Sequence, residues 1–485
     1  MQQNKDGVQK LFKQFGHFNV ILFLTATLLN AGSFEDFKRS QADSFSKYVD
    51  ERDSAFKTHL LSQWKEYNEY KGTPLYETPK PKNIVSAKRK KLKSVGPKIR
   101  VKIEKNSKNS EQVLSRPIIK NIKQKDISFN FYGTEVGFNI DAKMKSAKFY
   151  PLSQTGIGNF FDVLASSDYS YLISSLQKSA KNMQLNDWGV YLLVHKLSEN
   201  IYRNRDNAQL FSWFIFNKLG YRVKVGLSNK HIVVMYYSKK LIYATPNYKF
   251  KNKKYYVISK YAQGGVGSLY SYEQNYPDAT KAFNLALNHI PNFAKDMRDR
   301  TLIFTHDSKE YKVEYKYNQN IIDFMATYPQ ADYETYFNAP VENITYQSIA
   351  TSLKKHLDGI QASSAINFVL AFVQKSFTYQ VDDLQFGREK VMFAQETLYY
   401  DKSDCEDRAI LFAYLIKKIF KVGVIGVRYK DHMATALYIP ISGDSVRSNG
   451  RRFVIADPTY INSSIGQSMP KYRSVRPSSF IIVKN

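Results

Sequence analysis

The pattern of apolar positions changes along this chain. Over residues 33–71 aromatic and aliphatic positions return mostly every three or four residues, with charged residues between them. Gly and Pro are absent from residues 33–71, so this spacing predicts one or two amphipathic helices that pack on the rest of the protein. From about residue 127 the pattern mixes helical and strand-like stretches. The sequence therefore predicts an α+β fold behind an N-terminal helical segment.

The mixed region contains an internal repeat. Residues 210–237 (LFSWFIFNKLGYRVKVGLSNKHIVVMYY) align without a gap with residues 411–438 (LFAYLIKKIFKVGVIGVRYKDHMATALY), which places His231 on His432. Each copy should contain two helices followed by strands, with a β-rich stretch in front. Two further pairs of segments match in the same order, namely 192–202 with 369–379 and, allowing eleven extra residues, 243–248 with 455–460. The two β-rich stretches are 127–150 and 301–317.

These patterns divide the chain into six expected segments. In chain order they are a signal peptide at 1–32, an amphipathic helical segment at 33–78, a basic linker at 79–126, a first repeat domain at 127–255, a connector at 256–300, and a β-rich stretch with the second repeat domain at 301–485. Two tandem copies of one domain thus account for most of the chain.

The N-terminus has the form of an export signal. Lys5, Lys10 and Lys13 precede the apolar run FNVILFLTATLL (18–29), and the small pair Ala31-Gly32 follows it. The run is short for a membrane span and suits a cleaved signal peptide, although a buried helix of a cytosolic protein has the same length. No cysteine directly follows the run, which excludes a lipid-modified bacterial lipoprotein. We expect an exported protein that is periplasmic or on the cell surface.

Half of the net charge is concentrated in one segment. The chain carries a formal charge of +28, and residues 79–125 contain sixteen Lys and Arg against Glu104 and Glu111, a net of 16 − 2 = +14. This composition is typical of a solvated linker. It also suits contact with an anionic envelope polymer or with lipid headgroups. Nucleic acid is disfavoured, because export argues against it and no aromatic residues interleave the lysines.

The chain has a single cysteine, Cys405, in a setting that favours chemistry. Ser403 and Glu406 have the spacing of a capping box, which places Cys405 in the first turn of a helix, where the helix dipole favours a thiolate. His432 begins a predicted strand, and Asp457 ends the next one. A thiol, an imidazole and a carboxylate are the nucleophile, base and orienting group that cysteine catalysis requires.

The segments SDCED, DHMATALYI and FVIADPTY, in this order, resemble the bacterial transglutaminase-like cysteine peptidase superfamily, which has a papain-like fold. Ser403 stands where the family usually has glycine, while Glu396-Thr397-Leu398 matches its upstream motif. The resemblance covers about residues 365–460. It implies a papain-like domain in each repeat. The roles it implies are Cys405 as nucleophile, His432 as general base and acid, Asp457 as orienting carboxylate, Gln374 as oxyanion donor and Asp407 as a structural residue of the helix start.

The first copy lacks these groups. In the repeat alignment Cys405 falls on Asn204, Asp457 on Thr245 and Gln374 on Leu197. The first copy retains His231, which we expect to be structural. The first domain is therefore predicted to be a degenerate copy kept for folding, substrate positioning or partner binding.

The leading functional hypothesis is an exported cysteine hydrolase that cleaves peptide or amide bonds of a protein or peptide substrate through a thioester. The alternatives are a protein-crosslinking acyl transferase with the same triad and a non-catalytic envelope scaffold. We infer no cofactor, because the sequence contains neither a metal-ligand cluster of diagnostic spacing nor a phosphate-binding glycine loop. A Ca²⁺ site that includes Asp382 and Asp383 is left open.

Overall fold

The computed structural model describes residues 31–62, 64–76, 78–88, 93–103, 125–258 and 265–484. These residues form mixed α+β structure, in agreement with the fold class expected from the sequence. The expected signal peptide lies almost wholly outside the described residues and stays a prediction. Among the described helices, none is both long enough and apolar enough to cross a membrane.

The N-terminal helix is shorter than the sequence predicts. Helix α2 spans Ala31–Leu60, and the chain divides within it into two compact units, Met1–Asp53 and Ser54–Asn485. Trp64 Nε1 donates a hydrogen bond to the carbonyl of Leu60 at 2.7 Å, which satisfies one acceptor of the last turn. The described residues from 64 to 78 are extended rather than helical. Gly72 and Pro74 in this stretch disfavour a helix.

Two antiparallel sheets of the unit Ser54–Asn485 share one topology. The first sheet has the strand order β1-β8-β4-β5-β7-β6, and the second has the order β15-β16-β14-β13-β17. Read from its other edge, the second order is β17-β13-β14-β16-β15. It then matches the order β8-β4-β5-β7-β6 of the first sheet strand for strand, and β1 is an additional strand at the edge of the first sheet. The strands of the first sheet are β1 (Lys65–Tyr67), β4 (Val223–Ser228), β5 (His231–Tyr237), β6 (Asn247–Phe250), β7 (Lys253–Tyr256) and β8 (Leu269–Ser271). The strands of the second sheet are β13 (Val424–Arg428), β14 (Met433–Leu437), β15 (Ser445–Ser448), β16 (Arg451–Ala456) and β17 (Ser479–Ile482).

The central hairpins of the two sheets also share their register. In the first sheet Gly226 pairs with Val233, and in the second Val427 pairs with Ala434. Both strands are therefore offset by the same number of residues, 427 − 226 = 434 − 233 = 201. This is the offset that the gapless sequence alignment predicts, so the chain builds the same hairpin twice.

The register of the next strand corrects the third block of the sequence alignment. Tyr236 pairs with Tyr256 in the first sheet and Leu437 with Val454 in the second, so β7 corresponds to β16 with an offset of 454 − 256 = 198.

The first-copy equivalent of Asp457 is then residue 457 − 198 = 259, a serine that lies outside the described residues, and not Thr245. Thr245 precedes β6, on the other side of that hairpin. The sequence alignment failed there because it relied on identical Tyr and Pro residues. The strand pairing that defines the true equivalence cannot be read from the sequence.

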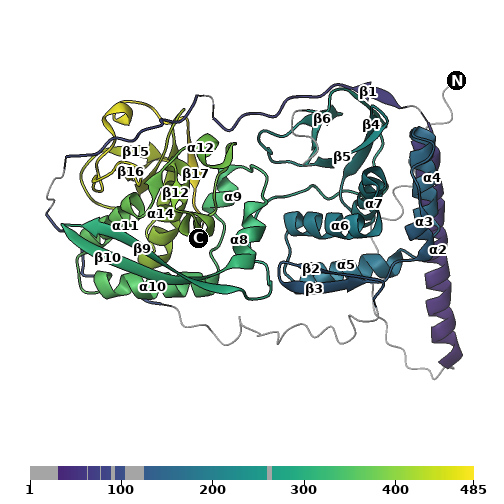
Figure 1. Cartoon of the computed structure of the whole chain (residues 1–485), viewed down its shortest axis with the longest axis horizontal. Coiled ribbons are helices and arrows are strands. Elements are labelled where there is room, and N and C mark those ends of the chain that lie inside the picture. The colour runs from purple at the N-terminus through teal and green to yellow at the C-terminus, as the bar shows by residue number, and fades with distance from the viewer. Residues whose placement is uncertain are drawn as a thin grey trace. The chain divides into compact units, whose positions relative to one another are not determined.

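One pair of helices packs against each sheet and comes before the central hairpin of that sheet in the chain (Figure 1). Helix α6 packs on α7, which lies against β4 and β5, and α11 packs on α14, which lies against β13 and β14. The bounds of these helices are α6 Asp187–Ile201, α7 Arg205–Lys218, α11 Ala362–Lys375 and α14 Cys405–Phe420. Twelve of the sixteen residues of α14 are buried, so this helix runs through the core of the second half.

Each half begins with a β-hairpin, as expected. The predicted connector is not a plain linker, because it contains β8, which completes the first sheet, and the start of β9. The hairpins are β2 (Ile127–Phe131) with β3 (Thr134–Phe138), and β9 (Met297–His306) with β10 (Lys309–Asn318). The remaining elements are α3 (Ala142–Ser146), α4 (Gln154–Ala165), α5 (Ser170–Asn182), α8 (Gln319–Ala326), α9 (Tyr333–Phe337), α10 (Asn343–Leu357), β11 (Thr378–Tyr379), α12 (Asp382–Phe386), α13 (Ala394–Tyr399), β12 (Lys402–Ser403) and a 3₁₀ turn (Pro470–Tyr472).

Part of the predicted basic linker packs on the protein. We call the described residues between 64 and 103 the N-terminal strap. Within it, the Ala87 amide donates to the Ile461 carbonyl at 2.7 Å, and the Ile99 amide donates to the Ile360 carbonyl at 2.9 Å. The strap is therefore held by backbone hydrogen bonds over the second half of the chain, which a freely solvated linker would not make. Residues 104–124 of the predicted linker lie outside the described residues.

The aromatic core of the first half provides a test of the fold. Trp213 is fully buried among Phe56 and Phe161, with ring centroids 6.2 and 5.6 Å away. Trp213→Ala should lower the free energy of unfolding by about 3–5 kcal/mol, because the cavity it leaves cannot fully collapse. Denaturant unfolding measures the change. Val475→Ala, at a position 47% exposed, should change it by less than about 0.5 kcal/mol, and equal effects of the two variants would contradict the assigned core.

Candidate active site

Cys405 is the first residue of α14 and is completely buried. The helix start is one residue later than the sequence suggests, because Asp404 is the N-cap and Asp407 is the third helical residue. The Asp407 carboxylate accepts a hydrogen bond from the Asp404 amide at 3.3 Å. The predicted capping box of Ser403 and Glu406 is therefore wrong, since the acidic pair next to it caps the helix. The prediction that Cys405 lies in the first turn is confirmed.

His432 and Asp457 are joined directly. The Nε2 atom of His432 lies 2.9 Å from Oδ2 of Asp457, and both side chains are about 2% exposed. The other oxygen, Oδ1 of Asp457, accepts hydrogen bonds from the amides of Thr459 at 2.9 Å and Tyr460 at 3.3 Å. The carboxylate is thus fixed, and it engages one imidazole nitrogen, which leaves Nδ1 as the nitrogen that can take a thiol proton.

The second sheet brings His432 and Asp457 together and lies against the helix that begins with Cys405. His432 immediately precedes β14, and Asp457 immediately follows β16. These strands are neighbours in the sheet, with Thr435 opposite Ala456, and α14 with its first residue Cys405 packs on β14. The ring of Tyr472 stacks on His432 at a centroid distance of 4.7 Å.

The pKa of Tyr472 also reflects the presence of Cys405 and Asp457. Burial and the charge of Asp431 raise the pKa of Tyr472, with further contributions from Cys405 and Asp457. His432 therefore stacks on this ring, and Cys405 and Asp457 lie near enough to influence its hydroxyl, although the three residues are far apart in the sequence.

Gln374 holds the loop that carries Asp457. Its Nε2 lies 3.1 Å from the carbonyl of Asp457, 2.8 Å from that of Tyr460, and 3.0 Å from Oγ of Ser463. An amide group has two N–H bonds, and this loop occupies both. Gln374 is thus placed to position the triad carboxylate, and its amide protons are not directed at an oxyanion. The backbone N–H of Cys405 has no intrahelical acceptor at its position in the first turn, so it is the candidate donor.

A cluster of buried carboxylates surrounds the start of α14. We call Asp382, Glu389, Asp404 and Glu406 the carboxylate cluster; they come from α12, the loop after it, and both sides of Cys405. The ammonium of Lys80, from the N-terminal strap, lies at their centre and is 8% exposed. Its Nζ forms ion pairs with Asp382 at 3.1 Å, Glu389 at 2.9 Å, Glu406 at 2.8 Å and also Asp404.

The electrostatics of the cluster depend on burial and on Lys80. Burial raises the pKa of Asp404 and, to about 9, the pKa of Asp382. Burial acts in the same direction on Glu406, but the charge of Lys80 and hydrogen bonds from Asp404 and Lys80 together outweigh it, so the pKa of Glu406 is lowered. Burial also acts against the charge of Lys80, yet the carboxylates raise its pKa well above the usual value. Lys80 and Glu406 are therefore the two members of this group whose pKa shifts favour their charged forms.

The thiol of Cys405 is neutral in this arrangement. Its Sγ donates to Oε2 of Glu406 at 3.1 Å. Burial and then the charges of Glu406 and Asp404 raise the pKa of Cys405 well above its usual value, which Lys80 only partly offsets. The expected thiolate at the helix N-terminus is therefore disfavoured, because burial and then the neighbouring carboxylates outweigh the helix dipole.

The cluster also contains the groups of carboxylates that could bind a metal ion. Two groups of three carboxylates are close enough to share an ion, Asp382–Glu389–Glu406 and Asp382–Asp404–Asp407. Lys80 bonds to members of both groups, so this chain supplies a cation of its own. Asp383 is exposed and does not share a site with Asp382.

Lys80 and Glu389 were missed by sequence reasoning. Lys80 lies 324 residues before Asp404 in a segment whose composition indicates a solvated linker. No local pattern distinguishes it from Lys82, which is exposed. Contacts of this kind are visible only in the folded chain.

The equivalent positions of the first half carry no thiol chemistry. Asn204 caps α7, and its side chain accepts from the Asn207 amide at 3.0 Å. The His231 side chain is 63% exposed and lies 3.1 Å from Asp206, which also accepts from the Ile232 amide. His231 thus stabilises the start of β5 through Asp206. Leu197, the counterpart of Gln374, is fully buried.

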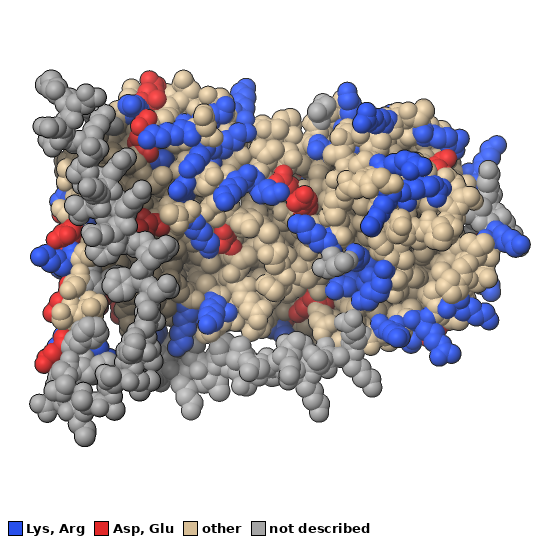
Figure 2. Space-filling view, turned by 180° about the vertical axis from the view of Figure 1, so that it is seen from behind, with Lys and Arg blue, Asp and Glu red and all other residues tan. Residues whose placement is uncertain are grey.

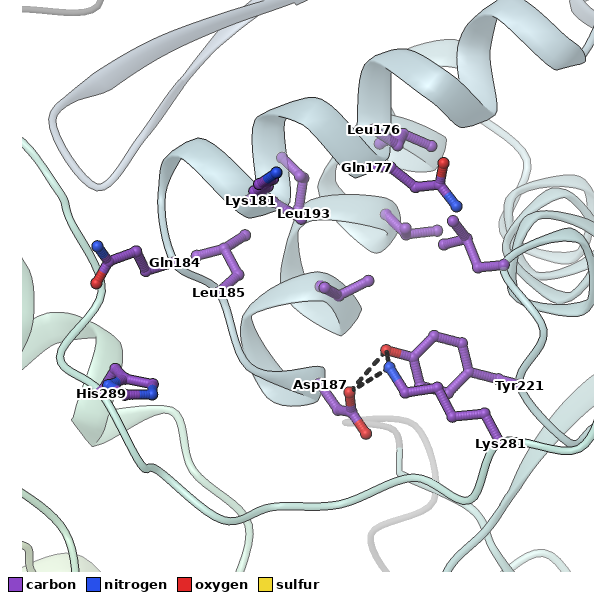
Figure 3. Close-up of a pocket in the computed structure, with 14 residues that line it drawn as sticks. Leu176, Gln177, Lys181, Gln184, Leu185, Asp187, Leu193, Tyr221, Lys281 and His289 are labelled. Atoms are coloured by element: carbon purple, nitrogen blue, oxygen red, sulfur yellow. Dashed lines mark hydrogen bonds and ion pairs between the residues drawn. The ribbon is translucent and has the colours of Figure 1, made fainter. Parts of the chain in front are cut away.

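A separate cavity of about 620 Å³ lies in the first half of the chain (Figure 3). Leucine and valine side chains form much of its wall. Its main polar feature is Asp187, which accepts hydrogen bonds from the Tyr221 hydroxyl and the Lys281 ammonium, both at 2.7 Å. None of the described residues that line it is Cys, Ser or Thr. The cavity therefore does not duplicate the thiol, imidazole and carboxylate set.

Comparison with known proteins does not extend these observations. No protein-family model, curated protein or solved structure matches the chain. The resemblance seen in SDCED and the segments after it remains a prediction from sequence, and the function of the site is argued from its geometry.

The neutral thiol predicts a specific pH dependence of alkylation. In the native full chain, iodoacetamide should modify Cys405 slowly near neutral pH, with a rate that rises steeply only above the range of an ordinary thiol. Mass spectrometry of the intact protein measures the rate, and the same chain unfolded in urea is the control. A rate that reaches its plateau below pH 8 would show that the resting thiol is ionised.

Asp382 predicts a pH dependence of stability. Its pKa is about 9 in the folded protein against a reference value of 3.8, so the folded state retains a proton that the unfolded chain has lost. The free energy of unfolding must then fall as pH rises through this interval. Asp382→Asn removes the titrating group, and its melting temperature relative to wild type should increase steadily from pH 5 to pH 9. A constant difference would contradict the assignment.

Proposed function

We propose that the chain is an exported cysteine hydrolase with transglutaminase-like domains, which cleaves peptide or amide bonds through a thioester. The observation that carries the proposal is the buried His432–Asp457 pair at 2.9 Å, which two neighbouring strands hold against the helix that begins with Cys405. The duplicated sheet topology supports two tandem domains of this kind, of which the first is degenerate.

The residues present account for each step of the reaction. Nδ1 of His432 takes the thiol proton, and Asp457 stabilises the imidazolium that forms. The thiolate of Cys405 attacks the carbonyl carbon, and the N–H of Cys405 donates to the oxyanion. His432 then returns the proton to the leaving amine, which breaks the C–N bond and leaves a thioester. Water, deprotonated by His432, hydrolyses the thioester and restores the thiol.

The resting geometry requires one rearrangement before this chemistry. The thiol donates to Glu406, and Cys405, His432 and Asp457 are all at most about 2% exposed. Substrate must therefore open the site, and the thiol must turn from Glu406 to the imidazole. A site that is closed at rest protects a reactive thiol from chance electrophiles.

Loss of the nucleophile tests the proposal. The full chain, incubated with a mixed peptide library, should generate new peptide termini that mass spectrometry maps, and Cys405→Ala should abolish them. Asp457→Asn should reduce the rate by roughly 10⁴-fold, the loss seen when an orienting carboxylate is replaced. Addition of a fluorescent primary amine separates hydrolysis from acyl transfer, since a transferase incorporates the amine. Cleavage that persists in Cys405→Ala would refute the proposal, and a Cys405→Ala chain with full biological activity would indicate a scaffold.

A further inference from the structure

Lys80 is fixed in place by contacts on both sides of it along the strap. Arg428 Nη2 donates to the carbonyl of Leu75 at 2.6 Å, and the hydroxyl of Tyr379 donates to the carbonyl of Pro81 at 2.7 Å. Arg428 ends β13, and Tyr379 ends β11. The second half of the chain therefore determines where the backbone of the strap runs, and the Lys80 side chain enters the protein at a defined point.

The carboxylate cluster has few other sources of positive charge. The guanidinium of Arg408 is buried nearby, but it donates to Oγ of Ser403 and to the carbonyls of Gln374 and Phe377. The ammonium of Lys390 pairs with Glu396. Among the described residues, the ion pairs of Asp404 and Glu406 are made with Lys80. The other titratable groups that interact electrostatically with the thiol include the phenols of Tyr76, Tyr379 and Tyr472. The carboxyl of Asp407 interacts with Asp404 and Glu406.

Two members of the cluster act directly on the start of α14. Asp404 is the N-cap of the helix, and Glu406 accepts the hydrogen bond of the thiol. Whatever holds these two side chains in place therefore sets the position of Cys405. A buried carboxylate deprived of its partner takes up a proton or moves toward water, and either change displaces it from its position in the folded protein.

We propose that Lys80 is a positioning residue of the Cys405 site, whose ammonium holds the carboxylate cluster together as a tethered cation. The inference rests on the proposed function for its catalytic consequence. The N-terminal strap is then a working part of the site, although it belongs to neither copy of the repeat. Lys80 itself touches neither the triad imidazole nor the carboxylate that orients it, and acts through Asp404 and Glu406.

Charge-conserving and charge-removing variants test this role in the full chain. Lys80→Met should lower the rate of peptide cleavage at pH 8 by ~10-fold or more, because small displacements of a nucleophile are costly. Lys80→Arg should restore most of the rate, since it returns a cation to the cluster. Lys82→Met, at an exposed position of the same strap, should behave as wild type.

The pH dependence of stability separates electrostatic positioning from simple packing. Without Lys80, burial raises the pKa of Glu406 in the folded state. Above the ordinary pKa of a glutamate, the folded state of the variant then keeps a proton on Glu406 that the unfolded chain has lost. The melting temperature of Lys80→Met should therefore fall further below wild type as pH increases from 5 to 9. A loss of packing alone would give a constant difference. If Lys80→Met does not fold, Lys80→Met/Glu389→Gln removes one charge of each sign and should fold.

Each outcome has a defined meaning. A Lys80→Met chain with wild-type cleavage, or a faster one, would overturn the proposal, and the faster rate would show that the strap blocks the site. A constant stability difference across pH would also overturn it. If the wild-type chain cleaves nothing, the proposed function fails, and the stability measurement still decides whether Lys80 holds the cluster.

Discussion

The burial of several carboxylates beside one thiol is the constraint on which the second half of this protein depends. Carboxylates rarely lie in a protein interior without a partner, because the loss of hydration costs more than a single contact returns. Here the partner comes from the N-terminal strap, and Lys80 connects the loop after α12 with the first turn of α14. The thiol, the helix start and the path of the strap are thereby coupled.

The distribution of charge over the molecule follows the same division. Figure 2 shows Lys and Arg side chains spread over one face of the protein, with few Asp and Glu side chains among them. Three acidic side chains that sequence would place on the surface, Asp404, Glu406 and Asp407, are instead fully buried. The net charge of +28 thus coexists with an acidic interior around Cys405.

The sequence predicts what depends on local pattern, and fails where distant segments meet. The period of the apolar positions located α7 and α14, and the gapless match from His231 to His432 predicted the shared register of the central hairpins. The placement of His432 before one strand and Asp457 after another followed from the same pattern.

By contrast, the equivalence of Asp457 with Thr245 was wrong, because the pairing of strands across a loop cannot be recognised from the sequence. The role of Lys80 was missed for a related reason: its partners lie more than 300 residues away.

The separation in sequence between Lys80 and its partners affects how the protein folds during synthesis. A ribosome that adds about 5–20 residues per second needs roughly 15–65 s to make the 324 residues that separate Lys80 from Asp404. For most of this time Lys80 lacks its acidic partners, because the earliest of them, Asp382, follows it by 302 residues. The residues of the first sheet are complete long before those of the second begin. Assembly of the Cys405 site is therefore among the last events of folding, and a product that stops short of α14 contains no part of the thiol chemistry.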